Sequence, residues 1–281
     1  MIRSLAVAGL CFVFIQLSGI ASVNADDNAS DSIIATNEST DTSGEFRLLP
    51  ESNKLFADES DDRTTLGRRL WAAPRWERRT GNDGVFPIDG DLNGVSFGWR
   101  SRNVDSLFLS VEGVIMDGGF DPTAGGKTDY QEWQIEGLLG YTFGSENEDT
   151  FLTPYLGFRY REAENELGPP LNLDVLQEAW SLPLGIRADH LLSDDIAIGI
   201  DARMQWKIDD DQVVTGAASI VDSSSNQLTY RIAAPFTFRL SENSEIELRP
   251  HYEWDRFDSD SGTRETRIEE RGGQVTFILR Y

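Results

Sequence analysis

Residues 132–143 read Glu-Trp-Gln-Ile-Glu-Gly-Leu-Leu-Gly-Tyr-Thr-Phe, and their side chains alternate in character with a period of two. One parity holds Trp133, Ile135, Gly137, Leu139, Tyr141 and Phe143, and the other holds Glu132, Gln134, Glu136, Gly140 and Thr142. Successive residues of a β-strand point to opposite faces, so the pattern predicts a strand with one apolar face. Such long strands are typical of a tilted strand that crosses a bilayer, which needs roughly 9–11 residues.

The same alternation recurs along the chain, for example in residues 196–207, 228–240 and 246–255, where the second parity is heavily charged. From about residue 67 onward no helical stripe of useful length is present. The pattern predicts about ten strands. We expect them near residues 68–79, 91–102, 105–117, 129–143, 151–163, 175–189, 195–208, 226–240, 244–257 and 264–281.

The connections between these strands suggest which face is turned outward. Short connections at 103–104, 145–150, 190–194 and 241–243 alternate with longer polar ones at 81–90, 119–128, 165–174, 209–225 and 258–263. Short periplasmic turns and long external loops are typical of outer-membrane barrels, whose even strand number returns both ends to the periplasm. We therefore expect a single closed, up-and-down antiparallel transmembrane β-barrel with its apolar parity facing lipid.

Outward aromatic residues gather near the expected strand ends, as in the aromatic girdles of membrane barrels. Near the periplasmic ends we place Trp99, Tyr141, Phe143, Phe151, Phe238, Phe277 and Tyr281. Near the outer ends we place Trp76, Trp133, Tyr160, Trp180, Trp206, Tyr230 and Trp254. The two groups match the orientation that the loop lengths predict.

The first residues have the pattern of a secretory signal peptide: Arg3, then a mostly apolar run over residues 5–20, then small residues. The pattern predicts cleavage between Ala25 and Asp26, so that residues 1–25 are removed. The only cysteine, Cys11, lies in this segment. Residues 26–66 are acidic and polar, and we expect them to form a disordered periplasmic leader before a barrel over residues 67–281.

The net charge of −23 argues against nucleic acid as a partner, because phosphate binding needs clustered Lys and Arg. No sequence motif predicts a cofactor or a metal site, and no stable protein partner can be inferred from the pattern. The acidic stretches at 209–211 and 258–270 are interpreted as a solvated outer rim.

The tail Val275-Thr276-Phe277-Ile278-Leu279-Arg280-Tyr281 resembles the closing strand of small bacterial outer-membrane β-barrel proteins, of porin-like, OmpA-like or omptin size. Residues 153–160 and 182–187 resemble other strands of these barrels. The resemblance implies location in the outer membrane, contact with its lipid, and recognition of Val275, Phe277, Leu279 and Tyr281 by the barrel-assembly machinery during biogenesis.

Two features depart from the family pattern. Pro154, Pro183, Pro235 and Pro250 fall within expected strands, where we expect local bulges. Arg267, Glu269 and Arg271 fall on the outward parity of the last strand, so that either a bulge shifts its register or this part projects above the membrane.

The polar parity would face the lumen, with charges of mixed sign at Arg159, Arg161, Arg203, Arg231, Arg249, His251 and Glu253. Their pairing would leave at most a narrow water path. We expect a non-enzymatic outer-membrane barrel with a structural or narrow-pore role for small solutes or ions. The alternatives are a surface adhesin or binding barrel, and a soluble exported barrel that holds an apolar ligand.

An enzyme is a further alternative, because the omptin proteases also have ten strands. A resemblance to them would imply catalytic aspartates and an Asp-His pair at the outer rim. Here the only histidines are His190, expected in a periplasmic turn, and His251, followed on its parity by Glu253 and Asp255. We expect His251 to be a luminal polar residue and not a catalytic base.

Overall fold

The barrel wall is built entirely from antiparallel strands. The computed structural model describes residues 65–82, 87–121, 128–144, 148–168, 172–215, 220–223, 227–258 and 265–281. Its strands are β1 (Gly67–Asn82), β2 (Pro87–Arg102), β3 (Ser106–Phe120), β4 (Thr128–Thr142), β5 (Thr150–Leu167), β6 (Leu173–Ser193), β7 (Ile196–Thr215), β8 (Ile220–Ser223), β9 (Gln227–Ala233), β10 (Phe236–Ser241), β11 (Ser244–Asp258) and β12 (Glu265–Arg280). The expected cleavage site at Ala25 and Asp26 lies outside the described residues. Within the described part of the chain, no helix has the length and hydropathy that a helical membrane span requires.

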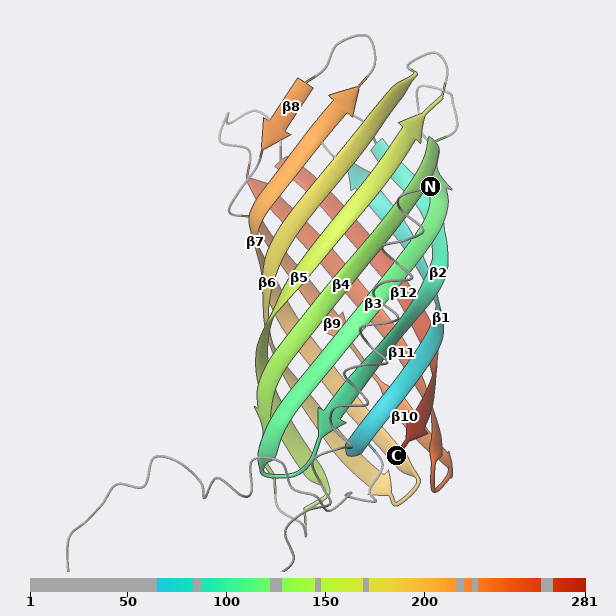
Figure 1. The fold of residues 1–281 in the computed structure, drawn as a ribbon, viewed down its shortest axis with the longest axis vertical. Helices are drawn as coiled ribbons and strands as arrows, with labels where there is room; N and C mark the ends of the chain where they lie inside the picture. The colour runs from blue at the N-terminus through green and yellow to red at the C-terminus, as the bar shows by residue number, and fades with distance from the viewer. Residues whose placement is uncertain are drawn as a thin grey trace, which may run out of the picture. The chain divides into compact units, whose positions relative to one another are not determined.

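The sheet closes on itself, because β1 pairs with β2 on one side and with β12 on the other. β9 and β10 are two halves of one wall strand, since each pairs with both β7 and β11. β8 is a short extension paired only with β7. The wall therefore has ten strands, and Figure 1 shows the barrel from the side, with its strands tilted against the long axis. The prediction of a closed antiparallel barrel of about ten strands is confirmed.

The two ends of the barrel differ in their connections (Figure 1). We call the end with the β2–β3, β4–β5, β6–β7 and β10–β11 turns the turn end, and the opposite end the loop end. The C-terminal Tyr281 lies at the turn end, directly after β12.

The two parities of each strand differ in exposure. In β5, Leu156 and Phe158 are exposed on the outer face, whereas Tyr155 and Arg159 are buried on the inner face. The same contrast holds around the wall, where Leu184, Ile200, Ile232, Leu248 and Leu279 are exposed while Arg187, Glu247 and Arg249 are buried. The exterior is thus apolar and the interior charged, which is the reverse of a soluble protein.

Several strands are longer at the loop end than the sequence predicts. β7 continues to Thr215 instead of ending near residue 208, and β6 begins at Leu173 instead of residue 175. At the opposite end, the turn end, β6 continues through His190 to Ser193, so that His190 lies in a strand and not in the turn expected for it. Beyond the apolar band both faces of a strand can be polar, so the alternation that marks the strand disappears while backbone pairing continues.

The expectation of bulges at the strand prolines is wrong. Pairing is interrupted beside Pro154, Pro183, Pro235 and Pro250, but the register is the same on both sides of each gap. A proline removes one donor from the ladder without adding a residue, so pairs are lost and no offset arises. The register shifts in the described ladders lie elsewhere, at Trp180/Ser181, Leu191/Ser193 and Arg239/Ser241.

The pairing of the last strand shows why Glu269 and Arg271 fall on its outward parity. β12 keeps one register with β11 from Leu279 to Glu265 and one register with β1, so no bulge is present. Glu269 and Arg271 therefore point outward, and the Arg271 side chain is 71% exposed. Outward charges at this height mean that the loop end of β12 extends above the apolar band.

Some apolar side chains point into the lumen, contrary to the simple alternation rule. Near the loop end Leu92, Val114, Met116, Phe120, Tyr130 and Ala163 form one buried cluster. At the turn end Leu66, Phe151, Leu191 and Ala197 form another, against which Val104 packs. Phe151 is fully buried, so its expected place in the outer girdle is wrong. Leu66 and the preceding Thr65 are also buried, so the chain entering β1 lies against the inside of the turn end.

The apolar exterior predicts a strong dependence on depth when charge is added. We expect Leu184→Arg, in the middle of β6, to lower the unfolding free energy in lipid vesicles by about 2–4 kcal/mol. Leu240→Arg, an exposed outer residue at the turn end of β10, is the matched control and should cost about 0–1 kcal/mol. Urea titrations of both variants measure this, and equal losses would contradict a lipid-facing band.

Candidate functional site: the charged lumen

A chain of ion pairs crosses the lumen near the turn end. Arg102 of β2 pairs with Asp189 of β6, and its Nε and Nη2 donate to Thr153 Oγ1 at 3.0 and 2.7 Å. Arg187 Nε lies 2.9 Å from Asp189 Oδ2, and its Nη2 lies 3.2 Å from Oε2 of Glu247 on β11. Arg249 Nη2 completes the chain at 2.7 Å from Glu247 Oε1. These side chains are almost fully buried.

A second group of ion pairs joins β11 to β1 and β12, the two strands that close the barrel. Arg69 Nη1 lies 2.9 Å from Glu245 Oε2, and Arg280 Nε lies 3.7 Å from Glu245 Oε1. Arg69 Nε also donates to the carbonyl oxygen of Leu66 at 3.2 Å, which ties the chain entering β1 to the inner wall.

Further toward the loop end, Glu77 and Arg79 of β1 are the centre of a third network. Glu77 pairs with Arg75 and Arg79 and contacts His251 Nε2 at 3.3 Å. Arg79 reaches Glu132 of β4 and Glu270 of β12, each at 2.8 Å. Glu77, Arg79 and Glu270 were not among the luminal residues predicted from the sequence. The signal for Glu77 and Arg79 was present in β1, where Arg69, Arg75, Glu77 and Arg79 share one parity.

The luminal residues that the sequence analysis named all lie on inward parities. Arg203 Nη1 donates to both oxygens of Glu136 at 2.8 Å, and Arg159 Nη1 donates to Gln205 Oε1 at 2.8 Å. Arg161 Nη2 donates to Gln177 Oε1 at 3.2 Å. Glu253 lies 3.9 Å from both Arg159 and Arg231.

Asp210 and Glu270 are buried, which corrects the interpretation of the stretches 209–211 and 258–270 as a solvated rim. Asp210 Oδ2 lies 2.8 Å from Lys207 Nζ, and its Oδ1 lies 2.8 Å from Gln177 Nε2. The register shift at Trp180/Ser181 skips one residue of β7, so that Lys207 and Asp210 both point inward.

Apart from Phe151, the expected girdle residues lie on outward parities, and several of them form ring contacts at the two ends of the barrel. At the loop end the ring centroids of Trp133 and Tyr160 are 5.0 Å apart, those of Tyr160 and Trp180 are 4.3 Å apart, and those of Tyr230 and Trp254 are 5.5 Å apart. Trp206 is exposed on the same parity of β7 as the apolar band.

At the turn end the rings of Tyr141 and Phe143 are 4.9 Å apart, and Trp99 Nε1 donates to the Tyr281 hydroxyl at 2.8 Å. Phe277, Leu279 and Tyr281 are exposed on the outer parity that they share with Val275. Their part in barrel assembly stays a prediction.

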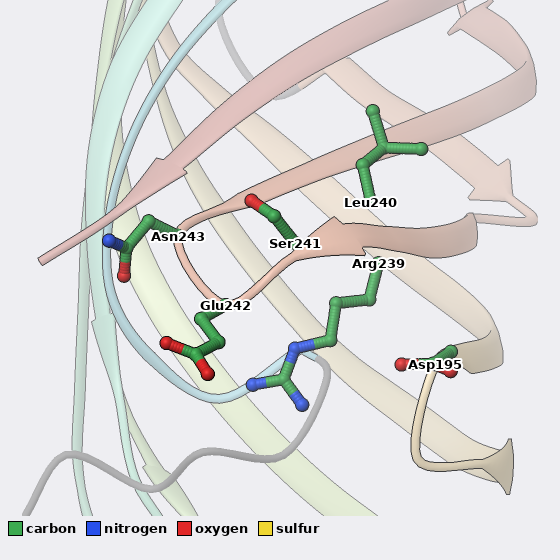
Figure 2. Close-up of a pocket in the computed structure, with 6 residues that line it drawn as sticks. All are labelled: Asp195, Arg239, Leu240, Ser241, Glu242 and Asn243. Atoms are coloured by element: carbon green, nitrogen blue, oxygen red, sulfur yellow. The ribbon is translucent and has the colours of Figure 1, made fainter.

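Figure 2 shows a hollow at the turn end, lined by Asp195 and by the β10–β11 hairpin residues Arg239, Leu240, Ser241, Glu242 and Asn243. The lining is mostly polar and belongs to two turns, as expected for a solvated periplasmic edge. Across the described residues, no three His, Cys, Asp or Glu side chains are grouped closely enough to hold a metal ion.

Comparison with solved structures agrees with this architecture. The translocator domain of the autotransporter NalP from Neisseria meningitidis matches with a TM-score of 0.50 and 10% identity, over 78% of this chain and 90% of that one. The chain has the fold of an outer-membrane β-barrel. The outer membrane protease OmpT from Escherichia coli matches with a TM-score of 0.45 and 10% identity, over 79% and 99% of the two chains. No protein-family model matches the chain, and no curated protein matches it.

The polarity of the wall locates this barrel in an outer membrane. Every wall strand has two paired neighbours, as hydrocarbon requires of spanning structures, and the outer face presents aliphatic side chains between aromatic groups. The charged face is turned away from lipid.

Removing one shared carboxylate should show how far the lumen depends on its ion pairs. Asp189→Asn leaves Arg102 and Arg187 without their common counter-charge, and we expect a loss of about 3–5 kcal/mol in unfolding free energy. Asp89→Asn is the matched control, because Asp89 pairs with Arg78 on the exposed outer face and should cost less than about 1 kcal/mol. Similar small losses in both variants, measured by urea unfolding, would contradict a structural role for the buried chain.

Proposed function

We propose that this protein is a structural outer-membrane barrel with a closed lumen and no enzymatic activity. The observation that carries the proposal is the set of buried ion pairs that join strands far apart in the wall. Arg102 of β2 meets Asp189 of β6, four strands away in a wall of ten. A contact at that separation passes through the interior instead of running along the wall.

Other cross-lumen contacts repeat this arrangement at different heights. Arg187 of β6 reaches Glu247 of β11, Arg203 of β7 reaches Glu136 of β4, and Arg79 of β1 reaches Glu132 of β4. A barrel of about eight strands is just filled by its side chains, so ten strands leave little extra room. Long arginine side chains that meet carboxylates across this space support a filled lumen.

The turn end adds an apolar barrier. Leu66 and Phe151 are fully buried there, and Leu191 is 7% exposed. This cluster adjoins the charged region, because Phe151 pairs in the ladder with Asp189. A hydrophobic constriction opposes the passage of hydrated ions.

The soluble-barrel alternative would require the aliphatic parity to face the lumen, and Leu156, Leu184 and Leu279 are instead exposed on the outer face. A protease of omptin type would require a catalytic imidazole at the rim. The His251 side chain is fully buried beside Glu77, where a protein substrate could not reach it. A surface-binding role would depend on residues 83–86, 122–127 and 259–264, which lie outside the described residues, and it stays an alternative.

Planar-bilayer recording tests the closed lumen. We expect the purified wild-type barrel in molar KCl to give no open-channel steps. The double variant Arg187→Ala/Asp189→Ala removes the bridges from β6 to β2 and to β11, and we expect it to give small conductance steps because water enters the space.

The control is Arg78→Ala/Asp89→Ala, which removes an exposed outer pair and should remain silent. Heat-modifiable gel migration checks that each barrel has folded. Stable conductance of the wild-type protein would overturn the proposal in favour of a narrow pore.

A further inference from the structure

Positive charge exceeds negative charge in the described part of the lumen near the turn end. Five arginines share three carboxylates there: Arg102 and Arg187 on Asp189, Arg187 and Arg249 on Glu247, and Arg69 and Arg280 on Glu245. A further carboxylate at this height, Asp201, accepts a hydrogen bond from Tyr155. The acidic residues therefore do not balance the arginines even before Arg100 is counted.

Arg100 of β2 is an arginine without a partner in this region. Arg100 is 8% exposed, and its Nε is buried without a hydrogen-bond acceptor. Its neighbours in the β-ladders are Arg69 on β1 and Ser110 on β3. Its main electrostatic neighbours are Arg187, Arg249, Arg69 and a single carboxylate, Glu247, which already holds two arginines.

Other unused donors lie near this guanidinium. Arg249 Nε is buried without an acceptor, although its Nη2 holds Glu247. Trp71 points inward and its Nε1 is also buried without an acceptor. The Trp71 ring lies directly over Gly98, two residues from Arg100, where a Cβ would come within 2.5 Å of the ring. This close approach keeps the indole on the inner wall beside Arg100.

A buried cation without a counter-charge is strongly destabilising, because its desolvation is not offset. An oxyanion removes that cost, since its oxygens accept several hydrogen bonds and guanidinium groups present paired donors to it. We propose that the turn end of the lumen binds one small oxyanion, a phosphate or a carboxylate, between Arg100, Arg187 and Arg249. The anion completes the charge balance of the lumen, and the site does not depend on whether the lumen conducts.

The same chemistry could come from a free solute or from the chain itself. Asp58, Glu59, Asp61 and Asp62 precede the buried Leu66 closely in the sequence, although they lie outside the described residues. The free oxyanion is the source we favour, because a phosphate has more acceptor oxygens than the two of a side-chain carboxylate and can meet more guanidinium groups at once.

The test measures the thermal unfolding of the full barrel in detergent, followed by heat-modifiable gel migration, with inorganic phosphate against sodium chloride at equal ionic strength. We expect phosphate to raise Tm by roughly 5–10 °C once it exceeds its Kd about a hundredfold. Arg100→Met should lose this phosphate-specific shift. Arg203→Met, which removes a luminal arginine that already holds Glu136, is the matched control and should keep it.

A second arm neutralises the acidic segment by Asp58→Asn, Glu59→Gln, Asp61→Asn and Asp62→Asn together. A phosphate shift that appears only in this variant supports the site and identifies the chain's own carboxylates as its usual occupant. If Arg100→Met does not fold, Arg100→Lys keeps the charge but loses the paired donors, and its phosphate shift should be smaller than in the wild type. The proposal is overturned if neither the wild type nor the neutralised variant responds specifically to phosphate.

Discussion

The closure of the sheet between β1 and β12 is the constraint on which the remaining structure depends. Hydrocarbon offers no partner to a backbone N–H or C=O, so a sheet inside a membrane cannot have a free edge. The β1–β12 ladder supplies the last row of pairs, from Arg69 with Arg280 to Asn82 with Arg267. Once the sheet is closed, every strand has one face toward lipid and one toward the axis. The period-two alternation of the sequence follows from this geometry.

Closure also forces the charged side chains together. In a wall of ten strands, side chains from opposite sides of the lumen are within reach of one another, and each buried ion needs a counter-charge. Shared carboxylates such as Asp189, Glu245 and Glu247 meet this need economically, each contacting two arginines. The charges are unevenly distributed, with arginines outnumbering carboxylates toward the turn end. The charges of the lumen are therefore cross-linked into networks and are not independent groups along the wall.

The sequence predicts the barrel, its strand number and the inward parity of residues such as Arg203 and Glu253, because alternation is a local signal. It does not predict which charges meet, since Arg102 and Asp189 are brought together only by the curvature and offset of the whole wall. Asp210 was assigned to the rim because the strand was expected to end near residue 208. β7 instead continues to Thr215, and a single skipped residue turns Asp210 inward, at a position that no local pattern marks. Phe151 was assigned to the outer face from its position near a strand end, although it shares the parity of the luminal Arg159 and Arg161, and it packs in one buried cluster with Leu66.

The prolines give the wall an uneven strength. Between β9 and β10, at Ala234 and Pro235, the ladders to β7 and to β11 are both interrupted, and Pro250 lies opposite the same gap. The hydrogen bonds from Gly199 N to Pro235 O and from Ala234 N to Pro250 O bridge this gap. In a cylinder held by hydrogen bonds between neighbouring strands, a row with fewer bonds on both sides is where the strands separate first under load. The wall strand between Gln227 and Ser241 is thus the place where the strands of this barrel would begin to separate.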